Sequence, residues 1–232
     1  MEIDWNIRHQ LYMKWSGGML FNYASYALEL NEDTLLLSDG TIKGSKGGQL
    51  IGFGFTIARD NRNSHFFTTA GEFYELRTVY YDKKLSSDFN FKEYSLDLRR
   101  YYSLSEKQSI SFQYYSGIQT TGVPFQKMFQ LGDFLRAYQT SRYLDRCITT
   151  LRSEYRIFPW DNKRKKRIGF VLFTEAGTVL DKFKDWRWDK KKFSYGVGTR
   201  FRLIEGEGML LRFDFGVSKE SINILFVAME AF

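Results

Sequence analysis

The sequence predicts an all-β protein, specifically an antiparallel transmembrane β-barrel. Three observations predict it: apolar and polar side chains alternate along many segments, these segments reach about ten residues, and aromatic residues make up 18% of the 232 residues. Successive side chains of a strand point to opposite faces, and a tilted strand needs about 9 to 11 residues to cross a bilayer. No segment approaches the roughly 18 continuous apolar residues of a transmembrane helix. The mean hydropathy is below zero, but an average conceals an alternating apolar face.

Six alternating segments precede a long connection at 119–146. Along residues 3–15 the odd positions are almost all apolar and the even positions are polar. The same period of two recurs at 51–58 and 109–114, and helical spacing fits none of these runs. We therefore expect strands near residues 3–15, 18–30, 49–59, 67–81, 89–103 and 107–118.

Five further segments follow the long connection. Leu151 and Tyr155 share one register, whereas Arg152 and Glu154 share the other. A soluble β-sandwich or a lipocalin-like barrel would also alternate, but sandwich strands usually run about 5 to 6 residues. The longer runs therefore favour the membrane barrel. The expected strands lie near residues 147–158, 167–179, 192–203, 208–217 and 223–232.

The connections between these segments alternate between short and long. Bacterial barrels place short turns in the periplasm and longer loops outside, so the last strand is expected to end in the periplasm and Met1 to lie outside. A closed bacterial barrel normally has an even number of strands. Either a twelfth strand lies near Thr34–Ser38, or upstream strands are absent from this chain. Residues 1–6 have no feature of a secretion signal, so an exported protein would be a mature form or part of a longer gene product.

Residue patterns that support catalysis or metal binding are sparse. His9 and His65 lack metal-ligand spacing, no Gly-x-Ser-x-Gly motif occurs, and Gly196-Val197-Gly198 lies within an alternating strand. The single Cys147 excludes an intrachain disulfide. The net charge is +7, but the cations recur singly rather than as a patch between aromatic platforms. We expect no enzyme activity, no catalytic residue, no metal, no cofactor and no nucleic-acid partner.

The long connection carries the most specific motif of the chain. Leu135-Arg136-Ala137-Tyr138, preceded by Gly132, resembles the Val/Leu-Arg-Gly-Phe/Tyr motif in loop six of the BamA/TamA superfamily of outer-membrane β-barrels. The resemblance runs from about Gly52 to Phe232. It implies that this loop folds into the barrel, and it is compatible with the eleven or twelve strands being part of a 16-stranded barrel. It also implies one barrel domain over residues 1–232, without POTRA repeats.

Arg136 requires fixed acceptors inside a barrel, because a buried unpaired charge costs several kcal/mol. Glu154 lies on the polar register of the strand after the loop, and Glu175 stands where the family has an acid, usually Asp. A forked pair of charge-assisted hydrogen bonds would latch the loop to the wall. Alternatively, these ionic residues only brace the barrel. Ala137 replaces the family's glycine, which would disfavour a left-handed backbone there.

The C-terminus is a second point of resemblance. Met229-Glu230-Ala231-Phe232 resembles the family's terminal outer-membrane targeting strand, and Phe226 and Phe232 are the aromatic candidates for that signal. Two basic segments are candidates for lipid contact. Residues 163–167 are expected to form a solvated turn, whereas 181–192, which combines tryptophans with lysines, is a candidate for contact with lipopolysaccharide.

The resemblance implies a protein of the bacterial outer membrane that inserts or translocates client β-barrel proteins. It would act by lateral pairing of a seam with client strands, since unpaired strand edges can template an incoming strand. The alternative is a reduced barrel that serves as a scaffold or accessory subunit of an outer-membrane complex, which the missing POTRA repeats and Ala137 favour. A passive pore is disfavoured by the expected plug. In each case the partners include outer-membrane lipid.

Overall fold

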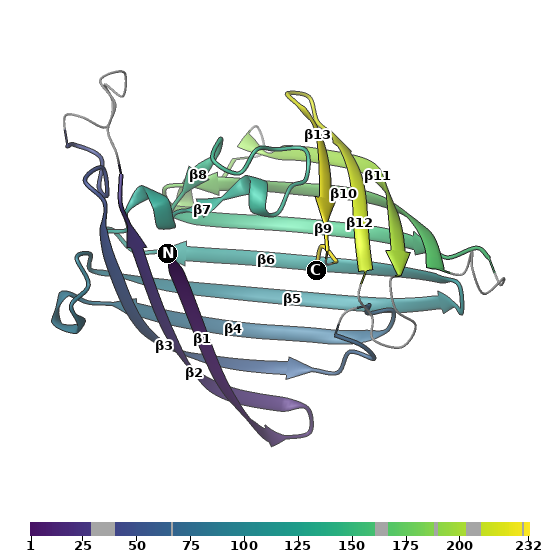
Figure 1. The fold of residues 1–232 in the computed structure, drawn as a ribbon, viewed down its shortest axis with the longest axis horizontal. Coiled ribbons are helices and arrows are strands. Elements are labelled where there is room, and N and C mark those ends of the chain that lie inside the picture. The colour runs from purple at the N-terminus through teal and green to yellow at the C-terminus, as the bar shows by residue number, and fades with distance from the viewer. Residues whose placement is uncertain (29–39, 66, 161–166, 188–189, 203–209, 229) are drawn as a thin grey trace.

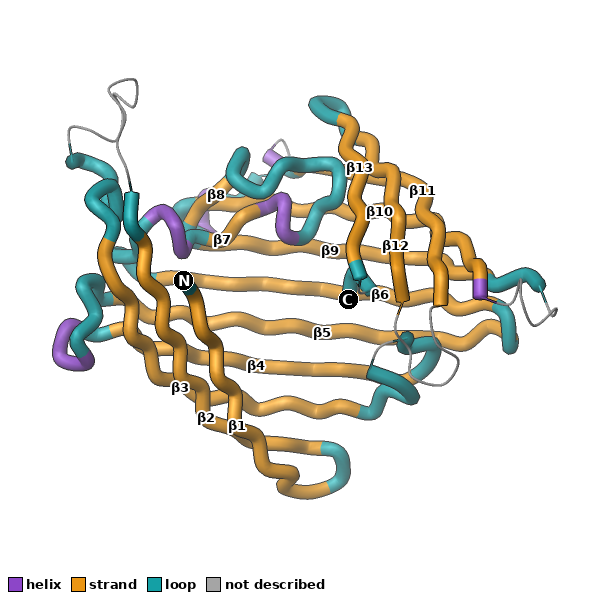
Figure 2. Tube along the Cα trace, viewed as in Figure 1, coloured by secondary structure: helices purple, strands orange, loops and turns teal. Residues whose placement is uncertain are grey.

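The computed structural model describes residues 1–28, 40–65, 67–160, 167–187, 190–202, 210–228 and 230–232. They form one antiparallel sheet of eleven strands (Figures 1 and 2), which confirms the predicted all-β architecture. The strands, in sheet order, are β1 (Glu2–Tyr12), β2 (Trp15–Tyr26), β3 (Gly48–Asp60), β4 (Gly71–Tyr81), β5 (Phe91–Ser105), β6 (Gln108–Gln119), β9 (Cys147–Ile157), β10 (Ile168–Leu180), β11 (Lys192–Arg202), β12 (Leu210–Val217) and β13 (Ile222–Val227). No helix within the described ranges has the length and hydrophobicity needed to cross a membrane.

The sheet follows chain order and is strongly curved, as Figure 1 shows, but it is not closed. Among the described residues, β1 pairs with β2 alone and β13 pairs with β12 alone. Both outermost strands therefore present a free edge. The possible strand near Thr34–Ser38 lies outside the described residues.

The two faces of the sheet reverse the usual polarity of a soluble protein. On β11, Tyr195 is 61% exposed, whereas Arg200 is 0% exposed. On β10, Leu172 is 57% exposed and Glu175 is 1% exposed. Large apolar side chains on the outer face and buried charges on the inner face are typical of a barrel whose wall contacts lipid. The alternation read from the sequence therefore predicted the correct two faces.

The first hairpin turns earlier than the alternation predicted. β1 ends at Tyr12 rather than at residue 15, because Met13 and Lys14 both have positive φ, at 43° and 72°. Two-residue hairpin turns with positive φ match the twist of antiparallel strands. Since Met13 continues the apolar register, the sequence pattern does not mark this turn. Trp15 consequently begins β2.

β4 begins at Gly71 rather than near residue 67. The preceding residues form a turn in which the Asn63 side-chain oxygen accepts hydrogen bonds from the backbone N–H groups of Thr69 (3.1 Å) and Ala70 (3.2 Å). Gly71 has a φ of 108°, which L side chains rarely adopt. The turn therefore ends, and the strand starts, at this glycine.

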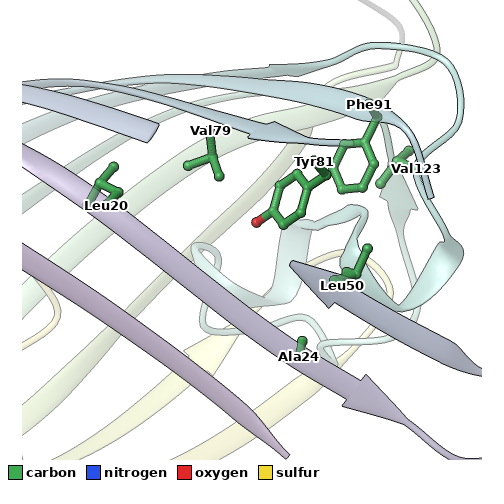
Figure 3. Packing of buried hydrophobic residues seen from close by; sticks show 7 residues of the cluster. All are labelled: Leu20, Ala24, Leu50, Val79, Tyr81, Phe91 and Val123. Carbon is green, nitrogen blue, oxygen red and sulfur yellow. The ribbon is translucent and has the colours of Figure 1, made fainter. Parts of the chain in front are cut away.

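A cluster of buried apolar side chains lies on the inner face of β2–β5, at the end of the sheet that carries the longer loops (Figure 3). Tyr81 and Phe91 stack with ring centroids 4.3 Å apart, and the Tyr81 hydroxyl donates a hydrogen bond to Asn22 at 2.9 Å. Val123, from the long connection between β6 and β9, packs into the same cluster. This apolar cluster therefore fixes the start of that connection against the N-terminal half of the sheet.

The long connection, residues 120–146, has structure that the sequence did not predict. It contains the 3-10 turns η2 (Phe125–Lys127) and η3 (Leu131–Asp133), and a short ladder between β7 (Phe129–Gln130) and β8 (Leu144–Asp145). Figure 1 shows β7 and β8 lying over the middle of the sheet, and η3, β7 and β8 make contact with β9 or β10. We call residues 120–146 the inner loop.

Candidate functional site

The tip of the inner loop has a small apolar core of its own. Leu131, Leu135, Ala137 and Tyr138 are buried together, and Leu131 and Leu135 are 0% exposed. Gly132 allows the loop to close, because a Cβ there would lie 2.6 Å from backbone atoms of Gln139. These are the motif residues that the sequence singled out, and together they hold the Arg136 backbone in one position.

The Arg136 side chain projects into a group of three carboxylates. Its backbone N–H donates to Glu175 Oε2 and its Nε donates to Glu175 Oε1, both at 2.7 Å. Its Nη2 forms an ion pair with Glu154 Oε1 at 2.7 Å, and its Nη1 donates to Asp214 Oδ2 at 3.0 Å. All three carboxylate side chains are 0% exposed. We call Glu154, Glu175 and Asp214 the carboxylate cage.

The structure thus places both acids proposed from the sequence within ion-pair distance of Arg136. Asp214, the third member of the cage, was not proposed. It lies on the inner face of β12, where its carboxylate also binds Arg200. The sequence places Asp214 on the polar register of that strand, but no neighbouring residue distinguishes it from the other polar residues there. Only the packing of β12 beside the inner loop selects it.

The Arg136 guanidinium also lies over an aromatic ring. Its Cζ is 3.6 Å from the centroid of Phe173 on β10, which is a cation–π distance. A Cβ on Gly196 would lie 2.5 Å from the Phe173 ring, and one on Gly198 would overlap the Asp214 carboxylate. The two glycines of β11 therefore make room for side chains in the lumen. The glycine pair is therefore explained by the packing of lumenal side chains against β11, without a need for local deformation of that strand.

The cage belongs to a larger ionic network. Glu154 also pairs with Arg156 at 2.6 Å and with Arg200 at 3.6 Å. Arg200 in turn pairs with Asp214 at 2.5 Å. The guanidiniums and carboxylates alternate in space, so each buried charge faces partners of opposite sign. Such compensation is required, because the attraction between buried charges must offset a large desolvation cost.

The electrostatics keep Arg136 charged. Burial by itself would lower the pKa of Arg136, but the negative charges of Glu154, Glu175 and Asp214 outweigh that effect and raise the pKa above its ordinary value. The guanidinium is therefore a permanent cation in the lumen. Removing it would take away the ion-pair partner of Glu175 and leave Glu154 and Asp214 with fewer neighbouring cations, Arg156 and Arg200 among them.

The backbone of the loop tip is also bound to the C-terminal strands. The Asn223 side chain donates to the Arg136 carbonyl at 3.1 Å, and the Ser221 hydroxyl donates to the Ala137 carbonyl at 2.6 Å. A Cβ on Gly216 would lie 3.1 Å from the Ala137 nitrogen, so this glycine permits the close approach. Ala137 has no positive φ. The alanine that replaces the family's glycine therefore causes no left-handed strain.

The C-terminal segment does not continue the last strand as predicted. β13 ends at Val227 rather than at residue 232, and Glu230 and Phe232 lie on the inner side of the sheet. Glu230 pairs with Arg200 at 3.1 Å, and the Phe232 ring lies 4.8 Å from the Arg152 guanidinium. The buried cations of β9 and β11 therefore attract this segment more strongly than a continued ladder would. Alternation alone could not reveal this competition.

The two aromatic residues proposed as a C-terminal signal occupy opposite environments. Phe226 is 69% exposed on the outer face, whereas Phe232 is 7% exposed in the lumen. Their role as a signal stays a prediction. We expect Phe232→Ala to lower the free energy of unfolding by roughly 2 kcal/mol, below the roughly 3 to 5 kcal/mol of a fully packed phenylalanine, because the terminal segment can relax. Phe226→Ala is the matched control, and urea unfolding of the refolded protein should show a clearly smaller loss. Equal losses would contradict the lumenal role of Phe232.

Other candidates from the sequence have simpler outcomes. Residues 163–166 of the basic turn lie outside the described residues. Within the described ranges, no group of His, Cys, Asp and Glu side chains is arranged to hold a metal, and the cage carboxylates bind guanidiniums instead. Cys147 is buried and free. The segment 181–192 is described except for 188–189, and it lies at the same end of the sheet as the inner loop.

The curved sheet with an apolar outer face, a charged lumen and an inward loop defines an outer-membrane-type β-barrel. The Omp85 superfamily domain matches residues 3–223, and the chain belongs to this superfamily. The fold is similar to the crystal structure of BamA from Haemophilus ducreyi lacking POTRA domains 1–3, with a TM-score of 0.66 and 13% sequence identity. That match covers 91% of this chain and 49% of the BamA chain, so the chain spans about half the length of that relative. No curated protein matches the sequence.

Proposed function

We propose that the protein assembles or translocates client β-barrel proteins in the bacterial outer membrane, with strand pairing rather than covalent chemistry as its mode of action. The observation that carries the proposal is the inner loop, which binds both halves of a sheet whose edge strands, β1 and β13, do not pair with each other among the described residues. Family membership supports the general role. The use of the seam and of the Arg136 latch is our own proposal.

The first part of the inner loop binds the N-terminal half of the sheet. The Lys127 ammonium pairs with the Glu2 carboxylate on β1, and the Gln126 amide donates to the Gly44 carbonyl at 2.7 Å. Burial by itself would lower the pKa of Lys127, but the charges of Glu93 and Glu2 raise it above its ordinary value, so the pair with Glu2 is ionic. This part of the loop therefore holds the β1 edge through a charged contact.

The loop tip binds the C-terminal half. Arg136 reaches Asp214 on β12, and its carbonyl accepts the hydrogen bond from Asn223 on β13. The loop thus connects the two edges through side chains instead of a ladder of backbone hydrogen bonds. Such a connection leaves the N–H and C=O groups of the edge strands available to a client strand, because a strand edge is a template for β-augmentation.

The latch has a mechanical role in this proposal. A barrel that opens at its seam must keep the rest of its wall in place while a client strand enters. The Arg136 cage joins β9, β10 and β12 to one loop. Removing one partner of a buried charged pair lowers the free energy of unfolding by several kcal/mol. We therefore assign the cage to the rigid part of the wall and the β1–β13 seam to the moving part.

The test is to lock the seam in a Cys147→Ser background. Asn6→Cys on β1 is combined in turn with Ile224→Cys, Leu225→Cys and Phe226→Cys on β13, and a bis-maleimide joins each pair. The crosslinked protein is expected to fold normally. It should fail to support insertion of client barrels in a strain depleted of the native protein. The control is Trp5→Cys with Phe21→Cys, which face each other in the β1–β2 ladder and whose crosslinking should leave insertion unchanged.

A scaffold or accessory subunit is the second candidate function. It is favoured by the packing of Glu230 and Phe232 in the lumen, which gives the C-terminal end of the sheet a fixed structure. Under this alternative the locked seam would support normal insertion of other barrels. That result would lead us to abandon lateral opening and adopt the scaffold.

A further inference from the structure

A hollow of about 590 Å³ lies on the outer face of the sheet, under the connection between β10 and β11. Its walls come from β6, β9, β10 and β11, and its roof comes from the connection itself, which includes the 3-10 turn η5 (Phe183–Asp185). The large side chains that line it, Tyr114, Leu151 and Phe193, are exposed on the outer face of the sheet, whereas Thr150 and Gly177, at its base, belong to the inward register. In a membrane barrel it opens toward lipid rather than toward the interior.

The sequence creates the hollow by placing small residues between large ones. Ala176 on β10 lies opposite Leu151 on β9 and Phe193 on β11, which are 56% and 57% exposed. In a neighbouring row, Thr178 lies opposite Thr149. The small side chains form the floor, and the large apolar side chains form walls that stand out from the sheet.

The roof is held down by specific contacts. The Thr178 hydroxyl donates a hydrogen bond to the Lys190 carbonyl at 3.2 Å, which fixes the returning loop against the wall. Phe183 and Trp186 line the hollow from the loop side. The Lys191 ammonium lies 4.6 Å from the centroid of the Trp186 ring and also lines the hollow. The apolar hollow therefore has an aromatic roof and a cation beside it.

The rim is positively charged. The described residues 181–187 and 190–192 contain six Lys or Arg and two Asp; Lys182 pairs with Asp181 and Lys192 with Glu220. This combination of an apolar cavity and a basic rim, at the level where strands meet loops, matches a ligand with an acyl chain and an anionic headgroup. Tryptophan and lysine are the residues that favour such a membrane interface. A purely apolar ligand has no group that would attract the basic rim, and a free anion has no chain to occupy the hollow.

We propose that this hollow binds the acyl chain of lipopolysaccharide, with the lipid A phosphate held by Lys191 and its basic neighbours. The longer loops of a bacterial barrel face outside, so the hollow lies in the outer leaflet, where the acylated and phosphorylated lipid A is the anionic lipid. The proposal rests on the proposed outer-membrane location but not on client insertion. Binding at this site would anchor the β9–β11 wall, the part that carries the cage, in the outer leaflet.

The test measures lipid retention by native mass spectrometry of the detergent-purified protein. The probes are bis-phosphorylated lipid A, the same lipid without phosphates, phosphatidylglycerol, phosphatidylethanolamine and inorganic phosphate. Ala176→Leu fills the floor of the hollow, and Lys191→Glu reverses the charge beside it. The matched controls are Thr174→Leu, at the next outward position of β10, and Lys84→Glu, an exposed lysine of another loop at the same end.

We expect bis-phosphorylated lipid A to bind at least tenfold more tightly to the unmodified protein and to both controls than to Ala176→Leu or Lys191→Glu. Removal of the phosphates should reduce binding at least fivefold. Equal binding by Ala176→Leu and Thr174→Leu would overturn the site. Full competition by inorganic phosphate would show an anion site without a lipid, and preference for phosphatidylglycerol would show a different lipid; either result would overturn the assignment. Client insertion is not measured here, so failure of this proposal leaves the seam proposal intact.

Discussion

Replacing Arg136 with methionine is expected to lower the free energy of unfolding by about 3 to 5 kcal/mol, the loss that follows removal of one partner from a buried ionic network. The reason is the cage: Glu154, Glu175 and Asp214 would remain buried without the cation that they share, although Arg200 would still pair with Glu154 and Asp214. Methionine keeps most of the side-chain volume, so the loss reports charge rather than a cavity. Urea unfolding of the refolded protein in detergent measures it.

Arg142→Met is the matched control for this prediction. Arg142 belongs to the same inner loop and pairs with Glu220 at 3.0 Å, but its side chain is 43% exposed. An exposed pair contributes about 0.2 to 1 kcal/mol, so the control should lose no more than that. Similar losses for the two variants would mean that the cage does not carry the latch.

A second measurement distinguishes a latch from a brace. If the cage holds the inner loop, Arg136→Met should make Lys127 accessible to trypsin in the folded barrel, whereas Arg142→Met should leave it protected. If the network only braces the wall, stability falls but the loop stays protected. That outcome would support the alternative in which Arg136, Glu154 and Glu175 have no role in movement.

The second large effect is expected from Glu154→Gln, which should lower the free energy of unfolding by about 3 to 5 kcal/mol. Glu154 is the carboxylate that Arg136, Arg156 and Arg200 share, and its side chain is 0% exposed. Glutamine keeps the shape but removes the charge, which leaves three neighbouring guanidiniums to repel one another. The same urea unfolding measures the loss, and adding Arg156→Gln should restore part of it, since residues of one network are not additive.

Glu72→Gln is the control for the shared carboxylate. Glu72 also pairs with two arginines, Arg59 at 3.1 Å and Arg100. The Arg59 side chain is 40% exposed and the Arg100 side chain is 44% exposed. Water can solvate these cations when the carboxylate is neutralised, so the expected loss is below about 1 kcal/mol. If Glu72→Gln costs as much as Glu154→Gln, burial does not set the strength of the network.

The alternation in the sequence determined the sheet and its two faces. Each of the eleven expected strands is present, because a period of two extends over whole strands and tolerates errors of a few residues. The same register placed Glu154 on the inner face, whereas Glu175, which shares a mixed face with Phe173 and Gly177, was expected there through the family resemblance. The motif around Arg136 gave the position of the loop tip through its resemblance to a family, and the family membership is confirmed. These features are local in the chain, so one segment at a time was enough to read them.

The tertiary structure decided the features that depend on residues distant in the chain. Asp214 joins the cage because β12 curves to within reach of a loop almost 80 residues earlier. Glu230 and Phe232 leave the strand because buried arginines of β9 and β11 bind them. The turn at Met13 and Lys14 is set by backbone twist, which leaves no mark in the alternation. The periodicity of a strand specifies which way a side chain points. Only the packing of the inner face against the inner loop specifies which charge the side chain meets, because buried charges must be compensated together.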